Sequence, residues 1–120
     1  METKEARWNA EQIVRISRSF MECRILLSGA ELDLFTVCAK EPLSAAKVAE
    51  RLGGADLRGL TVLLDALTAM DLLTKENGLY RTEFSAAQIL SADSQGSLLP
   101  VILHNVNLWA IWSRLTRKVV

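Results

Sequence analysis

Apolar residues recur at alternating spacings of three and four along the first third of the chain. This seam consists of Ile13, Ile16, Phe20, Cys23, Leu27, Ala30 and Leu34. Such spacing places the side chains on one face of a helix, and Asn9 with Gln12 has the form of a capping box at its start. We expect Gly29 to separate a long first helix from a short second helix over 30–38. A second apolar stripe beside the seam predicts that the first helix has two apolar neighbours.

The middle of the chain predicts two short helices and a hairpin. Ser44 is expected to cap a helix over 45–52, which Gly53-Gly54 ends, and Asp56 to cap a second helix from 57 to about 70. Segments 72–75 and 79–82 flank Asn77-Gly78, a pair typical of tight β-hairpin turns. Helix, helix and hairpin in this order indicate a winged helix.

The last third predicts two further helices. Thr82 is a candidate cap for a short helix over 83–90, and a polar link over 91–97 leads to a final helix ending near Leu115. That helix is apolar on nearly every side and carries Pro100 in its first turn, where proline is tolerated. The predicted fold is therefore mainly α: a winged helix-turn-helix with a small β-hairpin wing, flanked by long N- and C-terminal dimerisation helices. We expect one domain over 1–120, divided into 9–38, 44–82 and 83–120.

Charge argues against nucleic acid as the partner. The chain has 14 basic and 14 acidic residues, and its 120 residues are half hydrophobic, which suits one globular domain. The second helix of the winged helix carries Arg58 as its only basic residue, against Asp65 inside it and Asp56 and Asp71 at its ends. A DNA-reading surface needs several Lys or Arg side chains. An interaction domain is thus favoured, with a homodimeric winged-helix transcription regulator as the alternative.

The residues needed for common enzyme chemistry are missing from the pattern. The six glycines have no G-x-G spacing, and Cys23, Cys38 and His104 are one ligand short of a structural zinc site. We therefore predict no catalytic, cofactor-binding or metal-binding residue, and no enzyme activity of this chain alone. The charged start has no signal-peptide core and no apolar run is long enough to span a membrane. A cytoplasmic location with reduced thiols is the expectation.

The amount of apolar surface on the predicted helices suggests that the chain pairs with itself. The first and last helices carry more apolar side chains than the middle region can cover, and soluble monomers rarely expose such large patches. We expect a tight homodimer, with no nucleic acid and no membrane as partner. The expected interface residues are Ile13, Ile16, Phe20, Cys23, Leu27, Trp109 and Trp112.

Several motifs in order resemble a known family. They are GAELDLF at 29–35, LSAAKVAERLG at 43–53, RGLTVLLDAL at 58–67, Leu72-Leu73, NGLYRT at 77–82 and the tryptophan helix at 109–115. Together they resemble the N-terminal dimerisation domain of S-adenosylmethionine-dependent O-methyltransferases of plant phenolic and bacterial polyketide tailoring. The resemblance covers about 15–117. One departure is Asp71, which stands where the family usually has glycine.

The resemblance implies a role that the residues alone do not. This region would be the dimerisation and substrate-pocket-roof domain of a small-molecule O-methyltransferase. S-adenosylmethionine would be bound by a separate Rossmann-like catalytic domain, which is absent from 1–120. The last helix would line the acceptor pocket with Leu103, His104 and Asn107, and Trp112 would pack behind them. The methyl acceptor and the atom methylated are left open.

Overall fold

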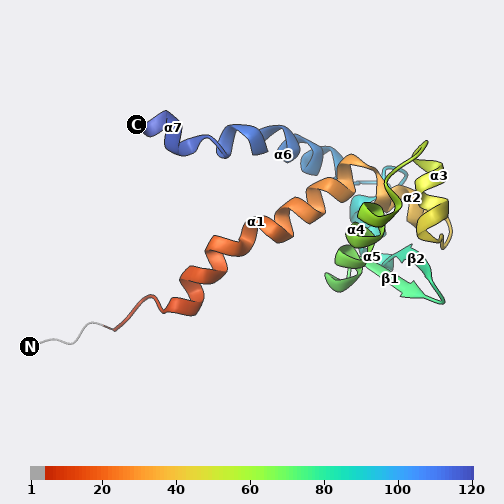
Figure 1. Ribbon diagram of the computed structural model, residues 1–120, viewed down its shortest axis with the longest axis horizontal. Helices are drawn as coiled ribbons and strands as arrows, with labels where there is room; N and C mark the ends of the chain where they lie inside the picture. Colours follow the sequence, from red (N-terminus) through yellow and green to blue (C-terminus); the bar gives the residue numbers. More distant parts are fainter. Residues whose placement is uncertain (1–4) are drawn as a thin grey trace, which may run out of the picture.

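The computed structural model describes residues 5–120 and is mainly helical, with one small antiparallel sheet. Figure 1 shows a body built from α2 to α5, from which α1 (Ala10–Glu31) and α6 (Leu99–Trp112) extend to the same side and diverge. The radius of gyration is 17.9 Å, against about 13–14 Å for a compact domain of this length. The shape is thus a body with two projecting arms.

Helix α1 begins where the sequence predicts but ends two residues after the expected break at Gly29. The backbone N–H of Gln12 donates to Asn9 Oδ1 at 2.8 Å, and the Asn9 N–H donates to Gln12 Oε1 at 3.0 Å, which completes the capping box. The expected break at Gly29 is wrong, because α1 continues to Glu31 and turns at Asp33, whose φ is 55°. Gly29 is needed for packing: a Cβ there would lie 3.0 Å from the Phe35 ring.

The body is centred on a buried cluster that joins all its elements. Helix α2 (Leu34–Lys40) crosses its middle, and Leu34, Phe35 and Cys38 are fully buried. Other members come from each following element of the body. They are Leu43, Val48, Leu60, Leu64, Leu67, Leu73, Tyr80, Ala86 and Leu90.

Two capped helices follow, with the predicted caps. The Lys47 N–H donates to Ser44 Oγ at 3.2 Å at the start of α3 (Ala45–Arg51). The Gly59 N–H donates to Asp56 Oδ2 at 2.8 Å at the start of α4 (Leu57–Ala69). Asp71, with φ 62°, ends the turn after α4 in the left-handed conformation that glycine adopts most easily.

The hairpin forms around the predicted Asn-Gly turn. Strand β1 (Leu73–Glu76) pairs antiparallel with β2 (Leu79–Thr82), and Asn77 and Gly78 both have positive φ, as a type I′ turn requires. Tyr80 also exchanges two backbone hydrogen bonds with Leu43, of 3.0 and 2.8 Å, so the hairpin is tied to the segment before α3.

The last helices differ from expectation in two details. Glu83 caps α5 (Phe84–Leu90) by accepting the Ala86 N–H at 2.8 Å. Thr82, the predicted cap, is buried and donates to the Phe35 carbonyl oxygen at 2.8 Å. The final helix is also interrupted: α6 stops at Trp112, and a short α7 (Leu115–Val119) follows. Pro100 lies in the first turn of α6, as predicted.

Candidate interaction surface

The outer part of α1 presents a row of bare apolar side chains. Ile13, Ile16 and Phe20 are 52%, 59% and 55% exposed, and Cys23 is also exposed. Leu27 lies two turns beyond Phe20 on the same face, but it is 2% exposed because α1 there has reached the body. Five predicted interface residues were expected on this helix; four of them are open to a partner, and Leu27 is already covered within one chain.

The second arm exposes an equally apolar surface. Trp112 is 66% exposed. Helix α6 is apolar on average and has no distinct polar face. Trp109, the other predicted interface residue here, is half-buried. Other large exposed apolar side chains on α6 and the segment after it include Val101, Leu103, Ile111, Leu115 and Val119. An apolar helix with almost no buried residue in its own chain is typical of an interface.

One arginine connects the two arms where they leave the body. The Arg24 guanidinium of α1 lies over the Trp109 ring of α6, 5.2 Å from its centroid. It also forms an ion pair with Glu31 at 2.7 Å and donates to Ser28 Oγ at 3.1 Å. Such a cation–π contact contributes about 0.5–1 kcal/mol. Arg24 therefore joins α1 to α6, a contact with no signature in the sequence because Arg24 and Trp109 are far apart along the chain.

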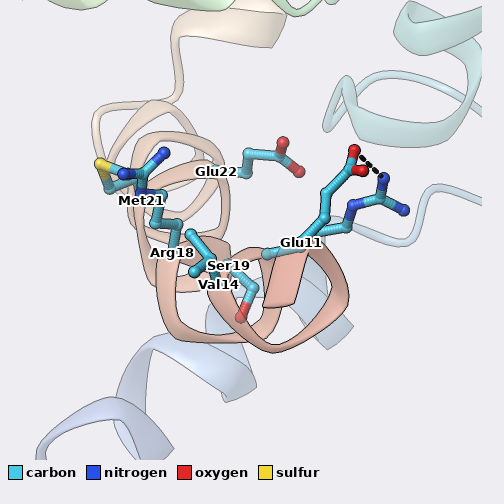
Figure 2. Close-up of a pocket in the computed structure, with 7 residues that line it drawn as sticks. Glu11, Val14, Arg18, Ser19, Met21 and Glu22 are labelled. Atoms are coloured by element: carbon cyan, nitrogen blue, oxygen red, sulfur yellow. Dashed lines mark ion pairs between the residues drawn. The ribbon is translucent and has the colours of Figure 1, made fainter. Parts of the chain in front are cut away.

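A shallow hollow on the surface of α1 is open to solvent. Its lining residues all belong to α1, and Figure 2 shows their side chains leaving this single helix in several directions. Val14 and Met21 form its apolar part, and Glu11 pairs with Arg15 across 3.7 Å. A surface made by one helix does not enclose a small molecule. It contains Val14 and Met21 of the second apolar stripe of the sequence.

A second hollow lies at the base of the arms, where α1, α5 and α6 meet. Leu26, Leu72, Ile89 and Ile102 supply its apolar wall, and Asp71 with Glu83 supply its acidic edge. Its volume is about 390 Å³. The sequence did not single it out, because its wall comes from four separate segments.

The predicted substrate-lining residues lie together on α6. Leu103, His104 and Asn107 are exposed, and Leu103 and Asn107 are one helical turn apart. Among residues 5–120, no group of three His, Cys, Asp or Glu side chains is placed to hold a metal ion. The described helices also include none long and apolar enough to cross a membrane.

The groups whose pKa values are shifted take part in the packing and hydrogen bonding of the fold. Burial raises the pKa of the Cys38 thiol to about 11, which keeps it protonated and unreactive. Asp65 accepts hydrogen bonds from the Tyr80 hydroxyl and, at 3.1 Å, from Lys75. The Tyr80 hydrogen bond, followed by that of Lys75, lowers the pKa of Asp65. This cluster ties the hairpin to α4.

Comparison with known proteins agrees with the resemblance seen in the sequence. The family model of the O-methyltransferase dimerisation domain matches residues 14–91. The tetracenomycin polyketide synthesis 8-O-methyl transferase TcmO of Streptomyces glaucescens is 36% identical over 106 residues, which are 87% of this chain and 31% of TcmO. The chain thus spans about a third of the length of this relative.

Solved structures match over nearly the whole chain. An O-methyltransferase family protein from Burkholderia thailandensis superposes with a TM-score of 0.81 at 27% identity, covering 93% of this chain and 33% of that one. PigF with SAH gives a TM-score of 0.81 at 26% identity, over 93% of this chain and 33% of PigF. Human N-acetylserotonin methyltransferase in complex with SAM shares the fold, with a TM-score of 0.80 at 24% identity, over 99% of this chain and 36% of the human chain.

Proposed function

Because the chain belongs to the O-methyltransferase dimerisation domain family, we propose that it pairs two copies of an S-adenosylmethionine-dependent O-methyltransferase that acts on a small molecule. The observation that carries the proposal is the pair of exposed apolar arms. In a single copy, Ile16 and Trp112 would remain more than half exposed to water. Pairing across a twofold axis would bury both arms in an interface of about 2,000 Å² or more, the size expected of obligate dimers.

The proposed interface consists of the exposed seam and the tryptophan helix. Its residues are Ile13, Ile16, Phe20, Cys23, Trp109 and Trp112. Leu27 is left out because its own chain covers it. Each buried Ile or Phe side chain would contribute roughly 1.5–3 kcal/mol, so folding and pairing would be strongly coupled.

The test replaces one interface side chain and one matched surface side chain. Ile16→Asp places a charge in the seam of α1, and Val62→Asp places the same charge on α4, where Val62 is 64% exposed. We expect Ile16→Asp to shift the chain to a monomer at micromolar concentration in sedimentation, while Val62→Asp stays paired. If Ile16→Asp pairs as tightly as Val62→Asp, the α1 seam is not the interface.

We further propose that α6 forms part of the roof of an acceptor pocket in the full-length enzyme. Leu103, His104 and Asn107 are exposed on one side of this helix, which supports their contact with another part of the protein. Replacing His104 and Asn107 together by alanine in the full-length enzyme should raise the KM for the acceptor severalfold and change kcat little. Unchanged kinetics in a correctly folded variant would remove both residues from the pocket.

We propose that the methyl donor binds outside the residues described. A nucleoside-binding turn joins a strand to a helix through glycines, so that the backbone approaches the ligand. Here the step from β2 to α5 passes through Thr82 and Glu83, and the Glu83 carboxylate caps α5 itself. We therefore place S-adenosylmethionine on the catalytic part of the full-length enzyme. The structures of PigF with SAH and of human N-acetylserotonin methyltransferase in complex with SAM support its use.

We propose that α3, α4 and the hairpin are a winged helix serving as a scaffold. The capped helix pair and the Asn-Gly hairpin support this assignment. The alternative of a transcription regulator is not supported, since the family and the relatives are methyltransferases. The acidic flanks of α4 also disfavour DNA. A cytoplasmic location belongs to the same proposal, and cell fractionation tests it.

A further inference from the structure

The hollow between α1, α5 and α6 has the features of a socket for an amphipathic side chain. Six aliphatic residues line its wall, among them Leu26, Ile89 and Ile102, and Asp71 and Glu83 lie at its edge. Ile89 is 48% exposed and Leu98, at the start of α6, is 50% exposed, so this region is bare in a single chain. The volume of about 390 Å³ exceeds that of any one side chain.

Charge limits where the occupant comes from. Within residues 5–120, neither Asp71 nor Glu83 takes part in an ion pair, and the same holds for Arg7. Residues 25–112 carry ten acidic and six basic groups, whereas 1–24 carry four acidic and five basic groups and 113–120 carry three basic groups and no acidic group. By charge, both ends of the chain complement the acidic hollow, and the choice between them rests on the aromatic anchor and the helix geometry.

The start of the chain also carries an exposed aromatic anchor. Trp8 is 57% exposed and lies just before Asn9, the cap of α1. Arg7 precedes it and is exposed too. A tryptophan beside an arginine matches a socket with an apolar wall and an acidic edge, and both residue types are enriched among interface hot spots.

Helix geometry brings this segment of a second copy to the hollow. The exposed seam residues Ile13, Ile16 and Phe20 are centred near residues 16–17. Antiparallel pairing of two α1 helices about a twofold axis at that point places position 8 of one copy beside about position 25 or 26 of the other, since every residue rises about 1.5 Å. Leu26 is one of the residues that line the hollow.

We propose that the Arg7–Trp8 segment of each copy docks into the hollow of the other, with the Trp8 ring against Leu26, Ile89 and Ile102 and Arg7 beside Asp71 and Glu83. This inference rests on the proposed dimer and adds a second contact to it, beyond the seam. The start of each chain would then anchor at the base of the partner's arms.

Disulfide trapping tests the contact directly. The variant combines Trp8→Cys and Ile89→Cys with Cys23→Ser, so that the buried Cys38 is the only other thiol. In one chain, residue 10 at the start of α1 and residue 26 at the hollow are separated by roughly 24 Å of helix. Position 8 lies before that start, far beyond the reach of a disulfide to the hollow of its own chain, so a bond joining positions 8 and 89 has to link two chains. The control combines Trp8→Cys and Val62→Cys in the same background.

We expect mild oxidation to convert most of the first variant to a covalent dimer, with peptide mapping placing the bond between positions 8 and 89, and little of the control. In addition, Trp8→Ala should raise the Kd of the dimer at least tenfold. A dimer by light scattering with no such bond, and an unchanged Kd for Trp8→Ala, would overturn the docking and leave the proposed function standing. A monomeric parent chain would overturn both.

Discussion

At the scale of single residues, the fold depends on contacts that join distant segments. Gly29 is required because Phe35 packs where its side chain would be. Thr82 is drawn from the cap of α5 into the core, where it donates to the Phe35 carbonyl oxygen. Glu83, the next residue, caps the helix instead. The contacts of Gly29 and Thr82 with Phe35 do not follow from local spacing, because they depend on where α2 lies.

The Asp65 cluster makes the first prediction at this scale. Its pKa is lowered in the folded chain by the Tyr80 and Lys75 hydrogen bonds, so the ionised form stabilises the fold. This contribution is present above the unfolded pKa of about 4 and is lost as pH falls through the lower, folded value. Asp65→Asn should therefore reduce the free energy of unfolding at pH 7.

Urea unfolding of both proteins between pH 7 and pH 2 measures this. The difference in stability between the native chain and Asp65→Asn should shrink as the solution becomes acidic. If the difference in the free energy of unfolding stays constant from pH 7 to pH 2, the charge of the Asp65 carboxylate does not contribute to stability.

At the scale of elements, sequence patterns predicted α1 to α6 and the hairpin, because most of their end signals are local. The capping box at Asn9, the caps Ser44 and Asp56, and the Asn77-Gly78 turn all act within a few residues. The end of α1 and the division between α6 and α7 have no such local signal, and the sequence patterns did not predict them. The exposed seam of the candidate surface was predictable from its spacing, whereas the hollow of four segments and the Arg24–Trp109 contact were not.

The element-scale prediction concerns how α6 is held. Because the Arg24 guanidinium covers the Trp109 ring, Arg24→Ala should loosen α6 without unfolding the body. Hydrogen exchange of the amides in 103–112 should become faster, and that of α4 should not change. Arg18→Ala, on the outer part of α1, is the matched control. Equal exchange in the two variants would show that Arg24 does not hold α6.

At the scale of the whole molecule, the chain is more extended than a compact domain of its length. The principal extents are 64 × 32 × 32 Å, and the long axis comes from the two arms (Figure 1). The body has a closed core, whereas the arms expose Ile16, Phe20 and Trp112. In the proposed dimer, a second copy would cover these surfaces with surfaces of the same kind, as a twofold interface requires.

The native molecular mass tests this account most directly. Light scattering after gel filtration, on the unmodified chain at several micromolar concentrations, should give about twice the chain mass of 13.3 kDa. The midpoint of thermal unfolding should rise with protein concentration, because pairing and folding are coupled. A mass of 13.3 kDa at every concentration would contradict the account, since the arms would then remain bare in solution.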